Sequence, residues 1–534
     1  MKKNALILLM VWSLWPGVCR GGDIVWLENM RLSHFIFQGN TVFSDDQLRL
    51  EAAPWKGQKI TPETLEGLRR RMTLFYTDRG YINSGALIAA LNPEQQSVTV
   101  TIIEGKLVRT QVLVTGRLKE KYISSRLKRA TETDRPFNIN RLNERLQLIK
   151  RDPRVKRING RVSPGLIPGE ATLDITAEAA NPVSVSMKLN NYGAPAIGAS
   201  KGEISLEHNN LTGWGDALKA TLKKTEGSTG LSFRHTTPLT RHNASLSVHY
   251  SQTDVALVSI PFDEFYIKSR VDVMGLELRR PFYISLKRSV SGGLRLKKID
   301  VKTYLLGEPF SFGAHPDDSE FSVTELSFFQ EWVETNGASI FLAKSDFRLG
   351  LGWFGATIHR EKNANYPDSR YLSWVGQIQW IKPLETFQSL FLLKTKLQLS
   401  NDSLMPVGKF SAGGASTVRG YREGRISGDN GRFLSLEWQI PVFDLKIPGI
   451  SEKPGDGQMS VCPFFDYGKA WNASAPDPEI KEIASVGAGL RWVINEKINA
   501  RVYWGRSLKR MEPSSEFNHL QDNGIHFQLA TRIF

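Results

Sequence analysis

The chain is poor in cysteine and in long apolar runs. It has two cysteines among 534 residues. Cys19 lies in an N-terminal leader, so Cys462 would have no partner for a disulfide in the mature chain. Past the leader, no apolar run reaches the about 20 residues that a membrane-spanning helix needs. A transmembrane β-barrel stays open, because its strands alternate in polarity and escape a hydropathy scan.

Signatures of catalysis and of metal binding are missing as well. The sequence has no phosphate-binding P-loop, no dinucleotide fingerprint and no G-x-S-x-G turn. Its nine histidines are scattered, and no group of Cys, His and carboxylate residues has the spacing of metal ligands. We therefore expect no catalytic residue, no metal, no cofactor and no enzymatic activity.

An N-terminal leader precedes the rest of the chain. Two lysines come before an apolar stretch at residues 5–14, and small residues follow. This order is typical of a secretory signal peptide. Lipidation of Cys19 is an alternative, which the bulky Val18 in front of it disfavours. We predict a signal peptide at residues 1–21 and a short connector at residues 22–30.

Acidic residues are in deficit, with 54 Asp and Glu against 69 Lys and Arg. The imbalance is concentrated between residues 31 and 177, which hold 25 basic and 15 acidic residues. A basic surface can bind nucleic acid. In an exported chain, however, anionic lipid or a secreted polypeptide is a better candidate partner, so we expect no nucleic acid.

Two modules of similar design are predicted before residue 178. Each has a strand, two helices and two further strands, and the unit repeats after about 75 residues. Thr61 is the expected N-cap of one helix, with Pro62 at its first position. The expected elements are a strand at 32–38, helices at 44–52 and 62–79 and strands at 84–91 and 98–103, then a strand at 108–115, helices at 120–130 and 139–150 and strands at 157–163 and 171–177.

From about residue 181 to residue 534 the polarity alternates with a period of two. One face is apolar and the other polar in roughly 16 stretches, as in a barrel with a wet interior and a lipid-coated exterior. A soluble β-sandwich buries the same kind of face and is the alternative. The leader favours the barrel. The clearest stretches are residues 218–223, 391–399, 434–440, 485–492 and 498–504.

A turn-rich segment, at about residues 401–431, interrupts the alternating pattern. Arg419 lies in its middle, and a planar guanidinium favours a carboxylate partner. A polar surface loop is the alternative. Six glycines let the backbone fold back on itself, at positions 413, 414, 420, 424, 428 and 431.

Several motifs together resemble one family, the outer-membrane transporters of two-partner secretion (TpsB; ShlB/FhaC/HecB-like), within the superfamily of POTRA-bearing barrels. In the loop, Val418, Arg419, Gly420 and Tyr421 match the signature motif of the family. Residues 464–468 match the motif of its partner strand through Phe464, Asp466 and Gly468. Further similarity to the two POTRA domains and to the start of the barrel is found at residues 37–40, 76–81, 103–105, 136–138, 151–153, 164–165, 190–193 and 210–216.

The resemblance implies a membrane all-β fold, a 16-stranded transmembrane β-barrel preceded by two periplasmic α+β POTRA domains. We expect the first POTRA domain at residues 31–105, the second at 106–178 and the barrel at 181–534, with a lumenal loop at about 401–431. The barrel would lie in the outer membrane of a Gram-negative bacterium. Family members carry a plug helix and a linker before the first POTRA domain, and the short connector here disfavours such a helix.

The resemblance also implies a salt bridge between the loop and the barrel wall, from Arg419 to Asp466. Spacing supports this pair independently. On the strand at 461–467 the odd-numbered residues are apolar or ring-bearing and should face lipid, so Asp466 should face inward. Glu437 also points inward, just after the loop, and is the second choice of partner.

The implied function is the export of one large unfolded exoprotein, similar to TpsA proteins, from the periplasm to the cell surface without nucleotide hydrolysis. Outer-membrane lipid and lipopolysaccharide would surround the barrel, and the barrel assembly machinery would insert it. Two alternatives stay open. An insertase that assembles outer-membrane proteins usually has more POTRA modules, and a passive porin or uptake receptor would need none.

Overall fold

The computed structural model describes residues 31–533 except residues 93, 261, 312–318, 360–365 and 510–518. The predicted signal peptide and connector, residues 1–30, and the terminal Phe534 lie outside the described residues. Among the helices in the described part of the chain, none is both long and apolar enough to cross a membrane.

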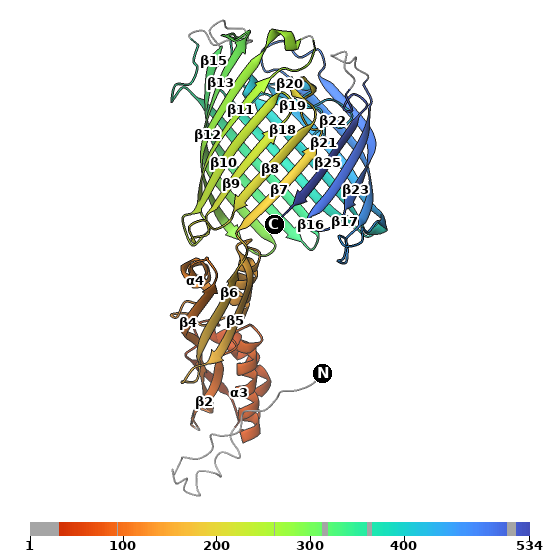
Figure 1. Cartoon of the computed structure of the whole chain (residues 1–534). Coiled ribbons are helices and arrows are strands. Elements are labelled where there is room, and N and C mark those ends of the chain that lie inside the picture. Colours follow the sequence, from red (N-terminus) through yellow and green to blue (C-terminus); the bar gives the residue numbers. More distant parts are fainter. Residues whose placement is uncertain are drawn as a thin grey trace. The chain divides into compact units, whose positions relative to one another are not determined.

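The first N-terminal module is a three-stranded sheet with two helices (Figure 1). The sheet order is β1-β3-β2, in which β1 (His34–Gln38) runs parallel to β3 (Ser97–Ile103) and β2 (Gly85–Asn92) runs antiparallel to β3. The helices are α2 (Asp45–Ala52), which continues into the short helix η1 (Ala53–Trp55), and α3 (Pro62–Thr77).

Helix α3 begins and buries its apolar face as predicted. The Thr61 hydroxyl accepts a hydrogen bond from the backbone N–H of Thr64, and Pro62 occupies the first helical position, where its missing N–H costs nothing. Leu68 and Met72 are fully buried in the core of the module. The 3.6-residue period of these apolar residues therefore fixes the face that packs on the sheet.

The second module repeats this composition of elements. Its sheet has the order β4-β6-β5, formed by β4 (Lys106–Thr115), β6 (Glu170–Ala179) and β5 (Val155–Pro164). Its helices are α4 (Glu120–Leu127), followed by η2 (Lys128–Ala130), and α5 (Ile139–Lys150).

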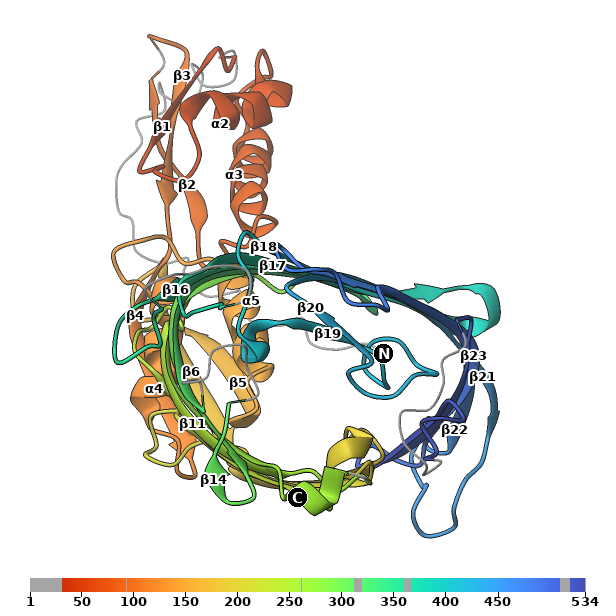
Figure 2. The ribbon, with the colours of Figure 1, turned by 90° about the horizontal axis from the view of Figure 1, so that it is seen from above.

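Most of the remaining strands form a closed barrel, seen along its axis in Figure 2. Seventeen strands of the described residues are in this sheet, and the two-residue β14 (Glu308–Pro309) pairs only with the end of β13, so 17 − 1 = 16 strands make the wall. They are β7 (Val183–Asn190), β8 (Lys201–His208), β9 (Ala217–Lys224), β10 (Ser228–Pro238), β11 (Ser245–Ala256), β12 (Lys268–Ile284), β13 (Arg288–Leu305), β15 (Glu320–Asn336), β16 (Ser339–Leu351), β17 (Leu372–Leu384), β18 (Ser389–Ser400), β21 (Asn430–Asp444), β22 (Gln458–Trp471), β23 (Glu482–Val493), β24 (Ile498–Ser507) and β25 (Ile525–Arg532).

Each wall strand pairs antiparallel with the next, and the ring closes where β25 pairs with β7. In the described residues, short helices occur in four connections of the barrel, η3 (Pro195–Ile197), η4 (Phe262–Phe265), η5 (Thr386–Gln388) and η6 (Pro406–Gly408). Closure of the ring confirms the predicted barrel and excludes the β-sandwich.

The period of two determines which side chains face the interior. On β22, Cys462, Phe464 and Asp466 are buried, whereas Phe465 between them is 38% exposed. The exposed apolar face of the other strands has the same character, with Val486 on β23 as an example. Apolar residues facing outward and polar residues facing inward are what a membrane-embedded barrel with an aqueous interior requires.

The turn between β8 and β9 is built by the polar residues of the motif at 210–216. Asp216 accepts hydrogen bonds from the backbone N–H of Thr212 at 2.9 Å and from the Thr212 hydroxyl at 2.7 Å. His235 Nε2 lies 3.0 Å from the other carboxylate oxygen. Asn210 Oδ1 accepts a hydrogen bond from the backbone N–H of Gly215 at 3.0 Å. The motif thus has a structural explanation as a hydrogen-bonded turn.

We expect this turn to lose protection in acid. Burial alone would raise the pKa of Asp216, but the hydrogen bonds from His235 and Thr212 outweigh it and lower the pKa from 3.8 to about 2. Because the folded pKa is below that of the unfolded chain, the carboxylate stabilises the turn above about pH 4, and this stabilisation is lost as the pH falls through about 2. Hydrogen exchange of a peptide covering residues 209–217, corrected for the intrinsic rate, should show this loss. The Asp216→Asn variant should show no such step, and a wild-type profile as flat as that of the variant would contradict the assignment.

Candidate functional site

The segment between β18 and β21 folds into the ring of the barrel (Figure 2). It contains the short helix η6 and a two-stranded ribbon of β19 (Phe410–Ala412) and β20 (Ile426–Gly428). The sequence indicated only turns here. A strand of three residues contains too little alternation to be recognised, so the ribbon was missed.

The signature motif of the loop is buried. Val418 is 0% exposed, and Arg419 and Tyr421 are each 5% exposed. Val418 and Tyr421 pack in an apolar cluster with the ribbon residues Phe410 and Ile426. A polar surface loop would be exposed, so the structure rules out that alternative.

Arg419 contacts two carboxylates of the barrel wall at once. Its Nε lies 2.8 Å from Asp466 Oδ2 and its Nη2 lies 2.9 Å from Asp466 Oδ1, a bidentate pair. The backbone N–H of Arg419 also donates to Asp466, at 3.0 Å. Nη1 donates to Glu437 Oε2, and Nη2 lies 3.2 Å from Ser435 Oγ. Glu437, the second choice from the sequence, therefore joins Asp466 in the contact and does not compete with it.

The opposite charges of this cluster stabilise the charged form of Arg419. Burial alone would lower the pKa of Arg419, but the hydrogen bonds and charges of Asp466 and Glu437 raise it above its ordinary value. The guanidinium therefore stays charged at every accessible pH. A buried ion pair of this kind is costly to break, because the partner left behind is a buried charge without compensation.

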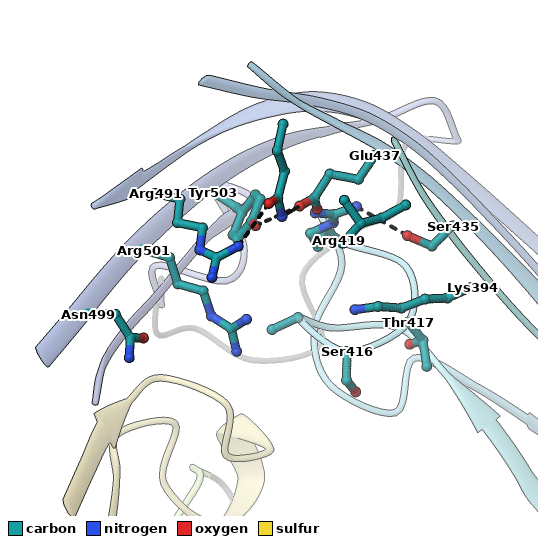
Figure 3. A pocket seen from close by; sticks show the side chains of 13 residues that line it. Lys394, Ser416, Thr417, Arg419, Ser435, Glu437, Arg491, Asn499, Arg501 and Tyr503 are labelled. Atoms are coloured by element: carbon teal, nitrogen blue, oxygen red, sulfur yellow. Dashed lines mark hydrogen bonds and ion pairs between the residues drawn. The ribbon is translucent and has the colours of Figure 1, made fainter. Parts of the chain in front are cut away.

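Aromatic side chains enclose the guanidinium. Its central carbon lies 3.6 Å from the ring centroid of Phe464 and 4.7 Å from that of Tyr503, distances typical of cation–π contacts. The Tyr503 hydroxyl donates to Glu437 Oε1 at 3.1 Å, and Gln439 Nε2 donates to the same oxygen at 2.7 Å. Figure 3 shows Tyr503, Glu437 and Ser435 around Arg419. The sequence placed Phe464 in the site and missed Tyr503 and Gln439, which lie on inward positions of strands already predicted.

Glycines of the wall make room for the loop backbone. A Cβ atom at Gly505 on β24 would lie 2.8 Å from the backbone nitrogen of Gly420, and one at Gly468 would lie 2.9 Å from Val418 Cγ2. Gly420 itself has φ +88°, which favours glycine. Gly468 therefore matters for the space it leaves, and Gly505 is a further member of the site that the sequence did not indicate.

A second anchor follows the signature motif. The Tyr421 hydroxyl donates to the carbonyl of Ala484 at 2.8 Å. Arg422 pairs with Asp522, Nη2 to Oδ2 at 2.8 Å, and the backbone N–H of Glu423 donates to Gln521 Oε1 at 3.0 Å. Asp522 and Gln521 belong to the connection between β24 and β25. Nothing in the local sequence predicts these contacts, because they join residues 63 to 100 positions apart.

Basic residues of the inner wall line a cavity of about 180 Å³ beside the loop. They are Lys394 on β18, Arg491 on β23 and Arg501 on β24. Lys396, on the same strand as Lys394, does not line this cavity and faces the lumenal ribbon, with its Nζ 5.5 Å from the ring centroid of Phe410. In the described part of the chain, no group of three or more His, Cys, Asp or Glu residues is arranged to hold a metal ion.

Known proteins are similar to this chain in sequence and in fold. Residues 169–492 match the family described as haemolysin secretion/activation protein ShlB/FhaC/HecB, and residues 30–105 match the POTRA domain, ShlB-type. The chain is 24% identical over 436 residues to the outer membrane transporter CdiB of Escherichia coli, across 78% of this chain and 70% of that one. It is 22% identical over 475 residues to the hemolysin transporter protein ShlB of Serratia marcescens, across 85% and 78%.

Solved structures agree on the fold. CdiB from Escherichia coli superposes with a TM-score of 0.72 at 20% identity, covering 94% of this chain and 90% of that one. BamA from Haemophilus ducreyi lacking POTRA domains 1-3 superposes with a TM-score of 0.57 at 15% identity, covering 95% and 100%. The match to the first family covers more than half of the chain. This chain therefore belongs to the ShlB/FhaC/HecB (TpsB) family of two-partner secretion transporters of the outer membrane, a family of transporters and not of enzymes.

Proposed function

We propose that the barrel is the pore through which one large unfolded exoprotein, similar to TpsA proteins, passes from the periplasm to the cell surface without nucleotide hydrolysis. In this proposal residues 31–105 and 106–178 are periplasmic POTRA domains that receive the exoprotein, and residues 181–534 are the barrel. Outer-membrane lipid and lipopolysaccharide surround it, and the barrel assembly machinery inserts it. Folding of the emerging chain outside biases its movement outward, since a few kcal/mol per folded increment rectifies diffusion.

The observation that carries the proposal is the contact of Arg419 with both Asp466 and Glu437. It joins a loop inside the barrel to two neighbouring wall strands, β22 and β21. The loop lies where an exported chain has to pass. We infer that the residues Val418, Arg419, Gly420 and Tyr421 set the position of the loop and thereby the state of the pore. The loop contacts the wall at Phe464, Asp466 and Gly468.

A deletion strain tests this function against the two alternatives. Loss of this chain should abolish the surface appearance of a very long, β-helical exoprotein encoded in a neighbouring reading frame, measured by immunoblot of intact, protease-treated cells. Unrelated outer-membrane barrels should keep their normal levels. A general fall in those barrels would favour the insertase, a selective loss of small-solute uptake would favour the porin or receptor, and undiminished surface exoprotein would contradict the proposal.

A further inference from the structure

The cavity beside the loop is lined mainly by polar and basic side chains. Its volume of about 180 Å³ is ample for a small anion with some water, since one water occupies about 10–15 Å³ on this measure. Figure 3 shows Lys394 and Arg501 extending toward the middle of the cavity from opposite sides, with Arg491 above Arg501. Ser416 of the loop and Asn499 of β24 complete the lower part of the lining.

The carboxylates near this cavity are already occupied. Both oxygens of Asp466 accept hydrogen bonds from Arg419. Glu437 accepts from Arg419 on one oxygen and from Gln439 and Tyr503 on the other. Arg419 therefore uses most of the negative charge of the site, and little is left for the other cations.

Those other cations have only neutral partners or none. Arg491 donates to Gln439 Oε1 at 2.8 Å, and Arg501 donates to Gln528 Oε1 at 2.9 Å. The Nε of Arg501 is buried and, within the described residues, has no hydrogen-bond acceptor. Lys394 likewise has neither a hydrogen bond nor an ion pair to any residue in the described ranges.

The charge count of the cluster is unbalanced. Four cations, at 394, 419, 491 and 501, lie beside two carboxylates, at 437 and 466, and a third carboxylate, Glu423, accepts the N–H of the lining residue Ala415 at 2.8 Å. Even with all three carboxylates charged, 4 − 3 = 1 positive charge is left beside the cavity. Burying a charge or a donor without a partner is costly, so such a site gains free energy by taking an anion.

We propose that Lys394, Arg491 and Arg501 form an anion-binding site in the lumen, which takes a single carboxylate or small oxyanion. Ammonium and guanidinium groups both bind such oxygens with charge-assisted hydrogen bonds. The site lies against the loop, so its occupant contacts the loop residue Ser416 as well as the wall. The anion has two sources: a free ion such as phosphate, or an acidic side chain of an exported polypeptide. The second source rests on the proposed function, whereas the first does not.

Calorimetry of the purified full-length protein in a chloride-poor, nonionic detergent buffer tests the site, with inorganic phosphate as the probe. Binding should weaken by about tenfold or more in Arg501→Gln and in Lys394→Gln, a change of about 1.4 kcal/mol. Lys394→Arg keeps the charge and should retain binding. The control is Lys453→Gln, which removes an exposed lysine that pairs with Glu496 and does not line the cavity. This variant should bind phosphate as wild type does.

A second titration distinguishes the two sources. An unstructured peptide rich in Glu and its Gln counterpart are added to the protein with and without phosphate. If the Glu peptide displaces phosphate and the Gln peptide does not, the site is assigned to carboxylates of an exported chain. If phosphate binds and neither peptide displaces it, the site is assigned to a free anion. Absence of binding by both probes, or equal phosphate affinity in wild type and in the folded Gln variants, would overturn the proposal. Phosphate binding does not involve export, so this result and the deletion experiment can fail separately.

Discussion

Arg419→Ala should abolish export of the exoprotein while the barrel still closes and reaches the outer membrane. The substitution leaves Asp466 and Glu437 buried without their cation, which costs about 3–5 kcal/mol for a pair of this kind. That cost falls on the seating of the loop, because the wall strands keep their own backbone pairing. Export is measured as protease-accessible exoprotein on intact cells, and barrel folding as the heat-modifiable mobility of the protein on gels.

Two companion variants sharpen this result. Arg419→Lys keeps a positive charge but loses the fork that contacts both carboxylates, so we expect partial export. Arg432→Ala removes an exposed arginine from β21, the strand that carries Glu437, and should leave export unchanged. Normal export by folded Arg419→Ala would remove the role assigned to the loop.

Gly505→Val should have an effect as large as the loss of Arg419. The first side-chain carbon at this position would lie 2.8 Å from the backbone nitrogen of Gly420, and backbone atoms on both sides cannot yield without moving the loop. Overpacking of this kind costs about 1–3 kcal/mol, and more where neither side can relax. We expect a folded barrel whose loop is displaced, with export reduced at least as far as in Arg419→Ala.

The matched control is Gly202→Val on β8. A Cβ atom at Gly202 would have only Leu189 Cδ2 within reach, at 3.8 Å, which is an ordinary contact. The same substitution in the same kind of strand should therefore leave export intact. Equal loss of export in both variants would show that any valine at a wall glycine harms the barrel. This result would contradict the specific role of Gly505 in making room for the loop.

Much of the architecture follows from short-range patterns in the sequence. The period of two along β22 correctly directed Asp466 inward and Phe465 outward. The N-cap at Thr61 and the apolar face through Leu68 likewise placed α3. Such features depend on neighbours within a few residues, and these are visible in a sequence.

The parts of the site that the sequence did not reveal all depend on contacts between distant segments. Tyr503 and Gln439 complete the surroundings of Arg419 from strands on either side of β22, and Gly505 matters only because Gly420 approaches it. The joint contact of Arg419 with Asp466 and Glu437 was missed for the same reason. Two inward carboxylates on adjacent strands were predicted as competitors, and only the register of β21 and β22 makes them partners.

A disulfide between the loop and the wall tests most directly whether Arg419 holds this loop inside the barrel. A Cβ atom at position 468 would lie 2.9 Å from Val418 Cγ2, compatible with the about 3.5–4.5 Å between Cβ atoms in disulfides. Val418→Cys with Gly468→Cys, in a Cys462→Ser background, should cross-link in oxidised cells. Val418→Cys with Phe465→Cys, which faces outward, should not. We predict that the first cross-link forms in high yield and falls sharply when Arg419→Ala is added; no cross-link at all, or the same yield without Arg419, would contradict the account.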